Sequence, residues 1–166
     1  MIYSIFSRFI STVGFIGYLP FAPGTFGTLA AVVFMVVLKP SVLSHIALTV
    51  FFIIAGIVSS NHAVKFFEDR PKFFPFRTKK ISGEKKDPSC IVIDEFAGYM
   101  ASLLFLPLSW SYIISAFVLF RFFDILKPPP LRRLEDVFNG GFGIMADDIG
   151  AAVYTNLVLQ LWRLLN

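Results

Sequence analysis

Three long stretches without a charged side chain constrain this chain more than any other feature. They run from Phe9 to Leu38, from Pro40 to Val64 and from Phe96 to Phe120. Each is longer than the roughly 18 apolar residues that indicate a transmembrane helix. Hydrophobic residues make up 56% of the sequence and charged residues 16%, which is more apolar than an ordinary soluble domain. We therefore expect an all-α, compact helical membrane protein, and 166 residues indicate one domain over 1–166.

Prolines mark where the chain turns. Lys39-Pro40-Ser41 separates a short helix predicted over Thr28–Leu38 from a long apolar helix predicted to end near Phe67, which gives a first helical hairpin. With only 11 residues, the short helix cannot cross a bilayer. We expect it to be tilted, partly inserted or shielded by protein.

A second hairpin is predicted around Pro107. Its first arm runs from Pro88, with Asp87 as the N-cap, to Leu106, and its second arm runs over 108–127 before a run of three prolines. These arms have 19 and 20 residues, enough at 1.5 Å per residue to cross roughly 30 Å of hydrocarbon. A last helix is predicted over 149–165.

Two segments, residues 1–18 and 65–87, have the composition of membrane-surface segments. Residues 1–18 have polar side chains at helical spacing opposite Ile and Phe, which predicts an amphipathic helix in the membrane interface. A surface helix of a soluble bundle is the alternative. Eight of the 15 Lys and Arg lie within 65–87, interleaved with Phe. This pattern is typical of a surface that binds nucleic acid or anionic lipid. The apolar residues around it favour lipid, and a solvated loop without a ligand is the remaining alternative.

The distribution of charge predicts an orientation. The net charge of the chain is +4, and threading the helices alternately places most Lys and Arg on one side, with Lys39 and Arg163 on the other. The positive-inside rule makes the basic side cytoplasmic. We therefore predict a cytoplasmic loop over 65–87 that contacts anionic membrane lipids, and no nucleic-acid partner.

Five acidic residues lie beside or inside the predicted apolar helices: Asp94, Glu95, Asp124, Asp147 and Asp148. If the chain turns at Pro107, all five lie toward the cytoplasmic face. Asp94 would then lie six residues, about 9 Å, inside its helix, where an unpaired carboxylate is costly. Arg121 and Lys127, each three residues from Asp124, or a divalent metal could meet this charge.

Ligands that are all carboxylate oxygens suit Mg²⁺, which commonly bridges to phosphate. One Cys and two His cannot build a Cys/His zinc site. An Arg/Asp ion-pair network without metal is the structural alternative. Asp147 and Asp148 could also merely cap the last helix, or follow a glycine-rich loop at a metal-phosphate centre. Thr25 and Thr28 offer hydroxyls and free amides at a helix start, which suit phosphate.

Four motifs, taken in order, resemble the phosphatidylglycerophosphatase A family. They are Pro23-Gly24-Thr25-Phe26-Gly27-Thr28-Leu29, Ile91-Val92-Ile93-Asp94-Glu95-Phe96-Ala97-Gly98, Phe120-Arg121-Phe122-Phe123-Asp124-Ile125-Leu126-Lys127-Pro128-Pro129-Pro130 and Gly140-Gly141-Phe142-Gly143-Ile144-Met145-Ala146-Asp147-Asp148. Their order and spacing match from about Pro20 to Leu161. The stretch 72–86 is longer than the family minimum, and Asn139 stands where a His can occur.

The resemblance implies a protein of the bacterial inner membrane, and the threading of the helices with the positive-inside rule predicts several passes and an active site that faces the cytoplasm. The resemblance also implies a Mg²⁺-dependent lipid phosphatase that converts phosphatidylglycerophosphate into phosphatidylglycerol and inorganic phosphate. By matching position, a metal-site or catalytic role falls to Asp94, Glu95, Asp124, Asp147 and Asp148, and a phosphate-facing role to Arg121 and Lys127. Which acid binds metal and which acts as base is not implied.

Other phosphatase chemistries are disfavoured by residue spacing. A cysteine-based phosphatase requires an Arg six residues after the Cys, but Phe96 stands six residues after Cys90. The Asp-x-Asp motif of an aspartate nucleophile does not occur, and neither His follows Ser-Gly as in a histidine-based lipid phosphatase. We therefore expect metal-assisted attack by water, with one carboxylate as general base. Two alternatives stay open: a non-catalytic, membrane-anchored lipid-binding or scaffold protein whose acids form only ion pairs, and an enzyme of the same fold acting on another phosphomonoester.

Overall fold

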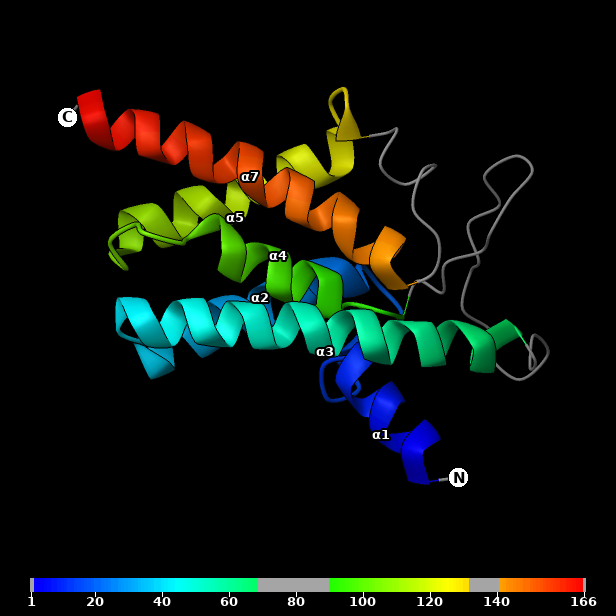
Figure 1. The fold of residues 1–166 in the computed structure, drawn as a ribbon. Helices are drawn as coiled ribbons and strands as arrows, with labels where there is room; N and C mark the ends of the chain where they lie inside the picture. Colours follow the sequence, from blue (N-terminus) through cyan, green and yellow to red (C-terminus); the bar gives the residue numbers. More distant parts are fainter. Residues whose placement is uncertain (1, 69–89, 132–140, 166) are drawn as a thin grey trace.

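The computed structural model describes residues 2–68, 90–131 and 141–165, and every regular element within these ranges is a helix (Figure 1). The elements are α1 (Ile2–Ser11), the 3-10 helix η1 (Ile16–Tyr18), α2 (Pro23–Leu38), α3 (Val42–Glu68), α4 (Ile93–Ser102), α5 (Trp110–Leu126) and α7 (Gly141–Leu165). The all-α prediction is confirmed. Most of the basic stretch 65–87, the predicted cap Asp87 and Asn139 lie outside the described residues.

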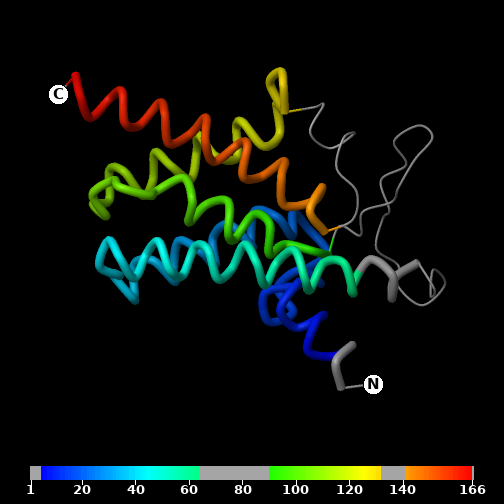
Figure 2. Tube along the Cα trace, viewed as in Figure 1, coloured from blue at the N-terminus to red at the C-terminus, as the bar shows by residue number. Residues whose placement is uncertain are grey.

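The core of the bundle is α4, against which α2, α3, α5 and α7 all pack. Figure 2 shows its trace running between α3 and α7. Its buried residues are Ile93, Phe96, Ala97, Gly98, Tyr99, Met100 and Ser102. A helix that is buried on nearly every side needs neighbours all round. The Tyr99 hydroxyl adds a direct tie to α5, because it donates to the Ile113 carbonyl at 2.9 Å.

The extent of α4 differs from the sequence prediction. The helix runs from Ile93 to Ser102 rather than from Pro88 to Leu106, so the first arm of the second hairpin has 10 residues and is too short to cross a bilayer. The reason lies in the preceding residue. Val92 has a non-helical backbone and donates its N–H to the carbonyl of Ser11 at 2.9 Å, so the chain before α4 bonds to the end of α1.

Two helices begin earlier than predicted. α2 starts at Pro23 rather than Thr28, because proline is well suited to the first turn of a helix. α7 starts at Gly141 rather than Ile149, and Asn61 on α3 explains this start. The Asn61 side-chain oxygen accepts the Gly141 N–H at 2.7 Å. A Cβ on Gly141 would lie 2.9 Å from the Asn61 backbone nitrogen, so only glycine lets α7 approach α3 this closely.

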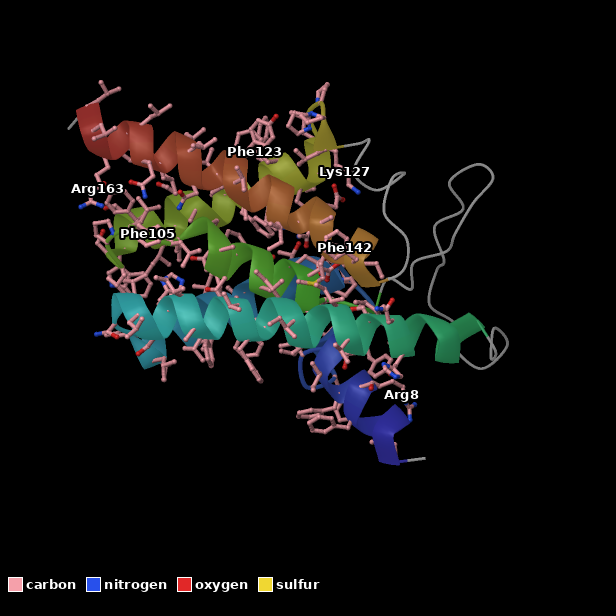
Figure 3. The ribbon with its side chains drawn as sticks, in the orientation of Figure 1. Arg8, Phe105, Phe123, Lys127, Phe142 and Arg163 are labelled. Carbon is pink, nitrogen blue, oxygen red and sulfur yellow. The ribbon has the colours of Figure 1, made fainter. Side chains whose placement is uncertain are left out.

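The chain reverses direction between α4 and α5, as the sequence predicts. Polar side chains of α7 satisfy the carbonyls exposed at this break. Asn156 donates to the carbonyls of Ser102 and Leu104, both at 2.9 Å, and Arg163 donates to that of Phe105 at 2.8 Å (Figure 3). A free carbonyl in apolar surroundings costs several kcal/mol. Side chains from α7 therefore make it possible for α4 to end inside the bundle.

The surface of the bundle is that of a membrane protein. Two helical segments are long and apolar enough to cross a membrane, Val42–Ala63 in α3 and Gly141–Leu165, while α2 is apolar but shorter. Large apolar side chains are exposed on several helices, including Val37, Phe51 and Ile125. Apolar surface this extensive is unfavourable in water and favours contact with lipid.

The helices end on two opposite sides of the molecule (Figure 1). The α2–α3 turn, the α4–α5 connection and the C-terminus lie at one end, and the N-terminal ends of α4 and α7 lie at the other. Lys39 and Arg163 belong to the first end, as predicted. α1 is helical only to Ser11 rather than to residue 18, because Val13 and Phe15 adopt positive φ values.

Candidate metal and phosphate site

The first turn of α4 carries Asp94 and Glu95. The prediction that Asp94 lies six residues inside its helix is wrong, because α4 begins at Ile93. At this position the carboxylates face the positive end of the helix dipole. Within the described residues, Asp94 Oδ1 and Glu95 Oε2 are buried and accept no hydrogen bond. Buried oxygens in this state call for a water or a cation.

The C-terminal part of α5 contributes one acid and two cations. Arg121 Nη1 lies 2.7 Å from Asp124 Oδ2 and 3.9 Å from Glu95 Oε1, so its guanidinium joins α5 to α4. The three side chains are only 14–18% exposed. Lys127 ends α5 with a positive φ, and its ammonium pairs with Asp147 on α7. Figure 3 shows Lys127 at the acid-bearing end of α7.

Asp147 and Asp148 lie well inside α7 and are 7% and 4% exposed. Neither caps the helix, because α7 already begins at Gly141. The described residues 141–148 are likewise helical, so they do not form the glycine-rich loop considered as an alternative. A buried pair of acids in the second turn of a long apolar helix is costly unless cations meet it. This burial distinguishes the pair from ordinary surface acids.

The five predicted acids come together from three helices. Carboxylate oxygens of Asp94, Glu95 and Asp148 lie within 4.8 Å of one another, and so do those of Asp124, Asp147 and Asp148. Asp148 belongs to both groups, and its Oδ2 is buried without a hydrogen-bond partner among the described residues. The predicted convergence of the acids at one end is thus confirmed.

The acids of the site could hold a metal cation as well as form ion pairs. The five carboxylates face only two described cations, Arg121 and Lys127. Burial raises the pKa of Asp94 well above its usual range, and the carboxylates of Glu95 and Asp148 raise it further. Burial also raises the pKa of Glu95. A hard divalent cation fits an all-oxygen donor set of this kind and would offset the repulsion.

Glycines allow the helices around the acids to approach closely. A Cβ on Gly24, at the start of α2, would overlap the Glu95 carboxylate and lie 3.4 Å from Arg121 Nη1. On α4, a Cβ on Gly98 would lie 3.1 Å from the Asp148 Cβ. The motif that contains Gly24 therefore lies directly against the acids. A phosphate-binding role for Thr25 and Thr28 of the same motif requires such a position.

The two threonines of that motif differ in their surroundings. Thr28 is fully buried, and its hydroxyl donates to the Gly24 carbonyl at 3.0 Å inside α2. Thr25 is partly exposed in the first turn, with its N–H bonded to the Ala22 carbonyl at 3.0 Å. The amides of Thr25 and Phe26 are therefore engaged rather than free. Of the two threonines, only Thr25 is partly exposed, because Thr28 is fully buried.

Cys90 has the properties of a structural residue. It is 2% exposed, and burial raises the pKa of its thiol to about 11. The nucleophilic form of cysteine is the thiolate, which is scarce at neutral pH for such a group. This agrees with the exclusion of a cysteine-based phosphatase from the sequence.

Sequence reasoning missed two residues that shape the site. Asn61 fixes the start of α7, and hence the positions of Asp147 and Asp148, but a single polar residue in an apolar helix carries no signal for a contact 80 residues away. Gly24 leaves free the space that the Glu95 carboxylate occupies and that a side chain at this position would fill. Its place in a Pro-Gly-Thr motif at a helix start was the only available signal.

A family model described as phosphatidylglycerophosphatase A matches residues 9–163. The chain belongs to this family. Each motif that suggested the resemblance contributes to the site: Gly24 from the first, Asp94 and Glu95 from the second, Arg121, Asp124 and Lys127 from the third, and Asp147 and Asp148 from the fourth.

Three curated relatives are similar to the chain. A phosphatidylglycerophosphatase A of Haemophilus influenzae is 50% identical over 82 residues, 47% of this chain and 50% of the relative. A putative phosphatidylinositol-3-phosphatase of Bacteroides thetaiotaomicron is 38% identical over 120 residues, 70% and 64% of the two chains. A phosphatidylglycerophosphatase A of Escherichia coli is 42% identical over 74 residues, 44% and 43%. The chain thus spans between two fifths and two thirds of their lengths. No solved structure matches it significantly.

Proposed function

We propose that the protein is a Mg²⁺-dependent lipid phosphatase that hydrolyses phosphatidylglycerophosphate to phosphatidylglycerol and inorganic phosphate. The observation that carries this proposal is the convergence of five acids from α4, α5 and α7, two of them buried and three partly buried, beside Arg121 and Lys127. Membership of the phosphatidylglycerophosphatase A family and two relatives with that printed name support the substrate.

The metal would be held by some of the five acids, which offer only oxygen ligands: Asp94, Glu95, Asp124, Asp147 and Asp148. Bound Mg²⁺ supplies a Lewis acid for phosphoryl oxygens and lowers the pKa of a coordinated water. The partnerless oxygens of Asp94, Glu95 and Asp148 fit this role, because each is buried and lacks a hydrogen bond among the described residues.

The remaining side chains have complementary roles in the proposed hydrolysis. Arg121 and Lys127 counter the negative charge that develops on the phosphoryl oxygens. A carboxylate that does not bind metal accepts the proton of the attacking water, and this proton passes to the leaving glycerol oxygen as the phosphorus–oxygen bond breaks. Thr25, partly exposed in the first turn of α2, can donate a hydrogen bond to the phosphate. Thr28 has no such role in this proposal, because its hydroxyl is engaged within α2.

The proposed location is the bacterial inner membrane, with several passes and the acids facing the cytoplasm. Lys39 and Arg163 lie at the end opposite the acids, and the basic stretch 65–87 begins in the last turn of α3, whose C-terminal end lies at the acid end (Figure 1). This distribution follows the positive-inside rule. The substrate is a membrane lipid, so its headgroup would approach the acids from the cytoplasmic leaflet.

A second candidate is hydrolysis of another lipid phosphomonoester. The relative named as a putative phosphatidylinositol-3-phosphatase covers the largest share of this chain among the three. The described residues include no contact that reads a glycerol rather than an inositol headgroup. Only a comparison of substrates separates the two functions.

The test is phosphate release by the purified protein reconstituted in lipid bilayers. Phosphatidylglycerophosphate, phosphatidic acid and a phosphatidylinositol phosphate are compared, each with Mg²⁺ and with a chelator. Selective, Mg²⁺-dependent release from the first supports the proposal, and selective release from another substrate supports the second candidate. Release from none, by protein shown to be folded, leaves the non-catalytic lipid-binding protein as the better interpretation.

A further inference from the structure

The N-terminal segment of the chain is attached to the residues that directly precede the acids of α4. The Ser11 carbonyl at the end of α1 accepts the Val92 N–H at 2.9 Å. A Cβ on Gly17, in η1, would lie 2.8 Å from the Cys90 carbonyl carbon. Val92 is the N-cap of α4, and Asp94 and Glu95 follow it in the first turn. These contacts fix where the helix that bears both acids begins.

The path of this segment is set by an uncommon backbone. Between α1 and η1 the chain turns sharply, with φ values of 47° at Val13, 65° at Gly14 and 71° at Phe15. A β-branched residue with positive φ is strained and persists only where its surroundings require it. Here the turn brings η1 back against Cys90 after Ser11 has bonded to Val92. The segment from α1 to η1 therefore closes over residues 90–92 like a clasp.

The opposite face of the clasp is apolar and exposed. Ile5 is 49% exposed, Phe6 63%, Phe9 47% and Phe15 51%. Arg8 is partly buried beside Tyr18 and carries a positive charge in the last turn of α1. α1 packs against α3, which is apolar enough to cross a membrane. The exposed face of α1 consequently lies beside the medium that surrounds α3. Aromatic side chains with an adjacent cation match the interface of an anionic bilayer.

We infer that residues 2–18 form a membrane-surface clasp that couples contact with anionic lipid to the position of Asp94 and Glu95. The lipid interface holds the aromatic face of α1, and the Ser11 and Gly17 contacts hold residues 90–92 in turn. The coupling rests on the proposed metal site, because its consequence is that divalent-cation binding depends on α1. In this inference the bilayer not only supplies the substrate but also helps to hold Asp94 and Glu95 in position.

The first experiment locates α1. Phe6→Cys is labelled with a fluorophore in protein reconstituted in anionic bilayers, and Ser41→Cys, in the exposed α2–α3 turn, is the control. The buried thiol of Cys90 does not compete for the label. The label at residue 6 should be quenched by lipids with brominated acyl chains and shielded from iodide, and the label at residue 41 should behave in the opposite way. Quenching by iodide at residue 6 overturns the inference.

The second experiment measures the coupling as Mn²⁺ affinity, read by electron paramagnetic resonance without substrate. Ile5→Ser with Phe6→Ser removes exposed side chains that no described contact requires, and should weaken Mn²⁺ binding about tenfold, as loss of outer support does at metal sites. Val42→Ser with Leu43→Ser, which removes two side chains at least as exposed at the other end of the molecule, should leave Mn²⁺ binding unchanged. Gly17→Ala should weaken Mn²⁺ binding while the label at residue 6 stays quenched.

The outcomes separate the clasp from the proposed function. Unchanged Mn²⁺ affinity in the Ile5→Ser, Phe6→Ser protein overturns the coupling, while Mg²⁺-dependent phosphate release by that same protein leaves the proposed function intact. Absence of Mn²⁺ binding by the unmodified protein overturns both. Equal weakening in the Val42→Ser, Leu43→Ser control also overturns the clasp, because it would show a general effect of removing lipid contacts.

Discussion

A Cβ atom on Gly98 would lie 3.1 Å from the Cβ of Asp148 and 2.9 Å from the ring of Phe120. This glycine therefore sets the distance at which α4 packs against α5 and α7. Asp94 and Glu95 on α4 share an oxygen cluster with Asp148 on α7 only because the two helices approach this closely.

Gly98→Ala should separate α4 from α7 by a few tenths of an ångström and disturb this cluster. We expect kcat to fall at least about tenfold, since small misplacements of catalytic groups have large effects. Steady-state phosphate release and thermal unfolding measure the two effects separately. Ala101→Ser, at a half-buried position one turn later, is the control, and equal losses in both variants would contradict a specific role for Gly98.

Asp124→Asn tests the metal-assisted mechanism directly. The amide keeps the size of the side chain but removes the charge that pairs with Arg121 at 2.7 Å and contributes to the second oxygen cluster. We expect turnover to fall to background with the helical content retained, measured by phosphate release and circular dichroism. Near-normal turnover would remove Asp124 from the site.

Arg121→Lys tests whether the guanidinium is needed for more than its charge. Arg121 reaches both Asp124 and Glu95 through Nη1, and lysine lacks the planar fork. We expect kcat to fall about tenfold or more, because a charge-stabilising donor is displaced. Arg163→Lys, at the opposite end of the bundle, should keep kcat. A normal kcat for Arg121→Lys would limit Arg121 to an electrostatic role.

Thr28→Val separates packing from phosphate binding in the Pro-Gly-Thr motif. Its hydroxyl is bonded to the Gly24 carbonyl, so the variant should lose about 1 kcal/mol of stability and keep its KM. Thr25 is partly exposed, so Thr25→Val should instead raise KM. Substrate titrations and thermal unfolding of both variants provide the measurement. A raised KM in Thr28→Val with unchanged stability would return Thr28 to the phosphate site.

Asn156→Leu tests the capping of α4 by α7. The change leaves the carbonyls of Ser102 and Leu104 without their 2.9 Å donors, and should cost about 1–3 kcal/mol. Thermal unfolding in detergent measures the loss. Gln160→Leu, which removes one bond of 3.4 Å, should cost less. Equal stability of the Asn156 variant and the unmodified protein would show that water reaches these carbonyls.

Much of the fold followed from local sequence. Uncharged stretches predicted helices, and the turns after Leu38 and before Trp110 were predicted from prolines, because proline cannot continue a helix. The reversal between α4 and α5 then placed all five acids at one end. Four motifs in order were enough to suggest the family that the comparisons show.

The tertiary structure decided where helices begin and which acids meet. α4 begins at Ile93 because Val92 bonds to Ser11, and α7 begins at Gly141 because Asn61 accepts its N–H. Both partners are far away in the sequence, so no local pattern can reveal them. Spacing along the chain identified the acids as a set, but the division into two groups sharing Asp148 depends on interhelical distance. That distance is fixed where the helices pack at glycines. The sequence shows the glycines, but it does not show which helices pack against them.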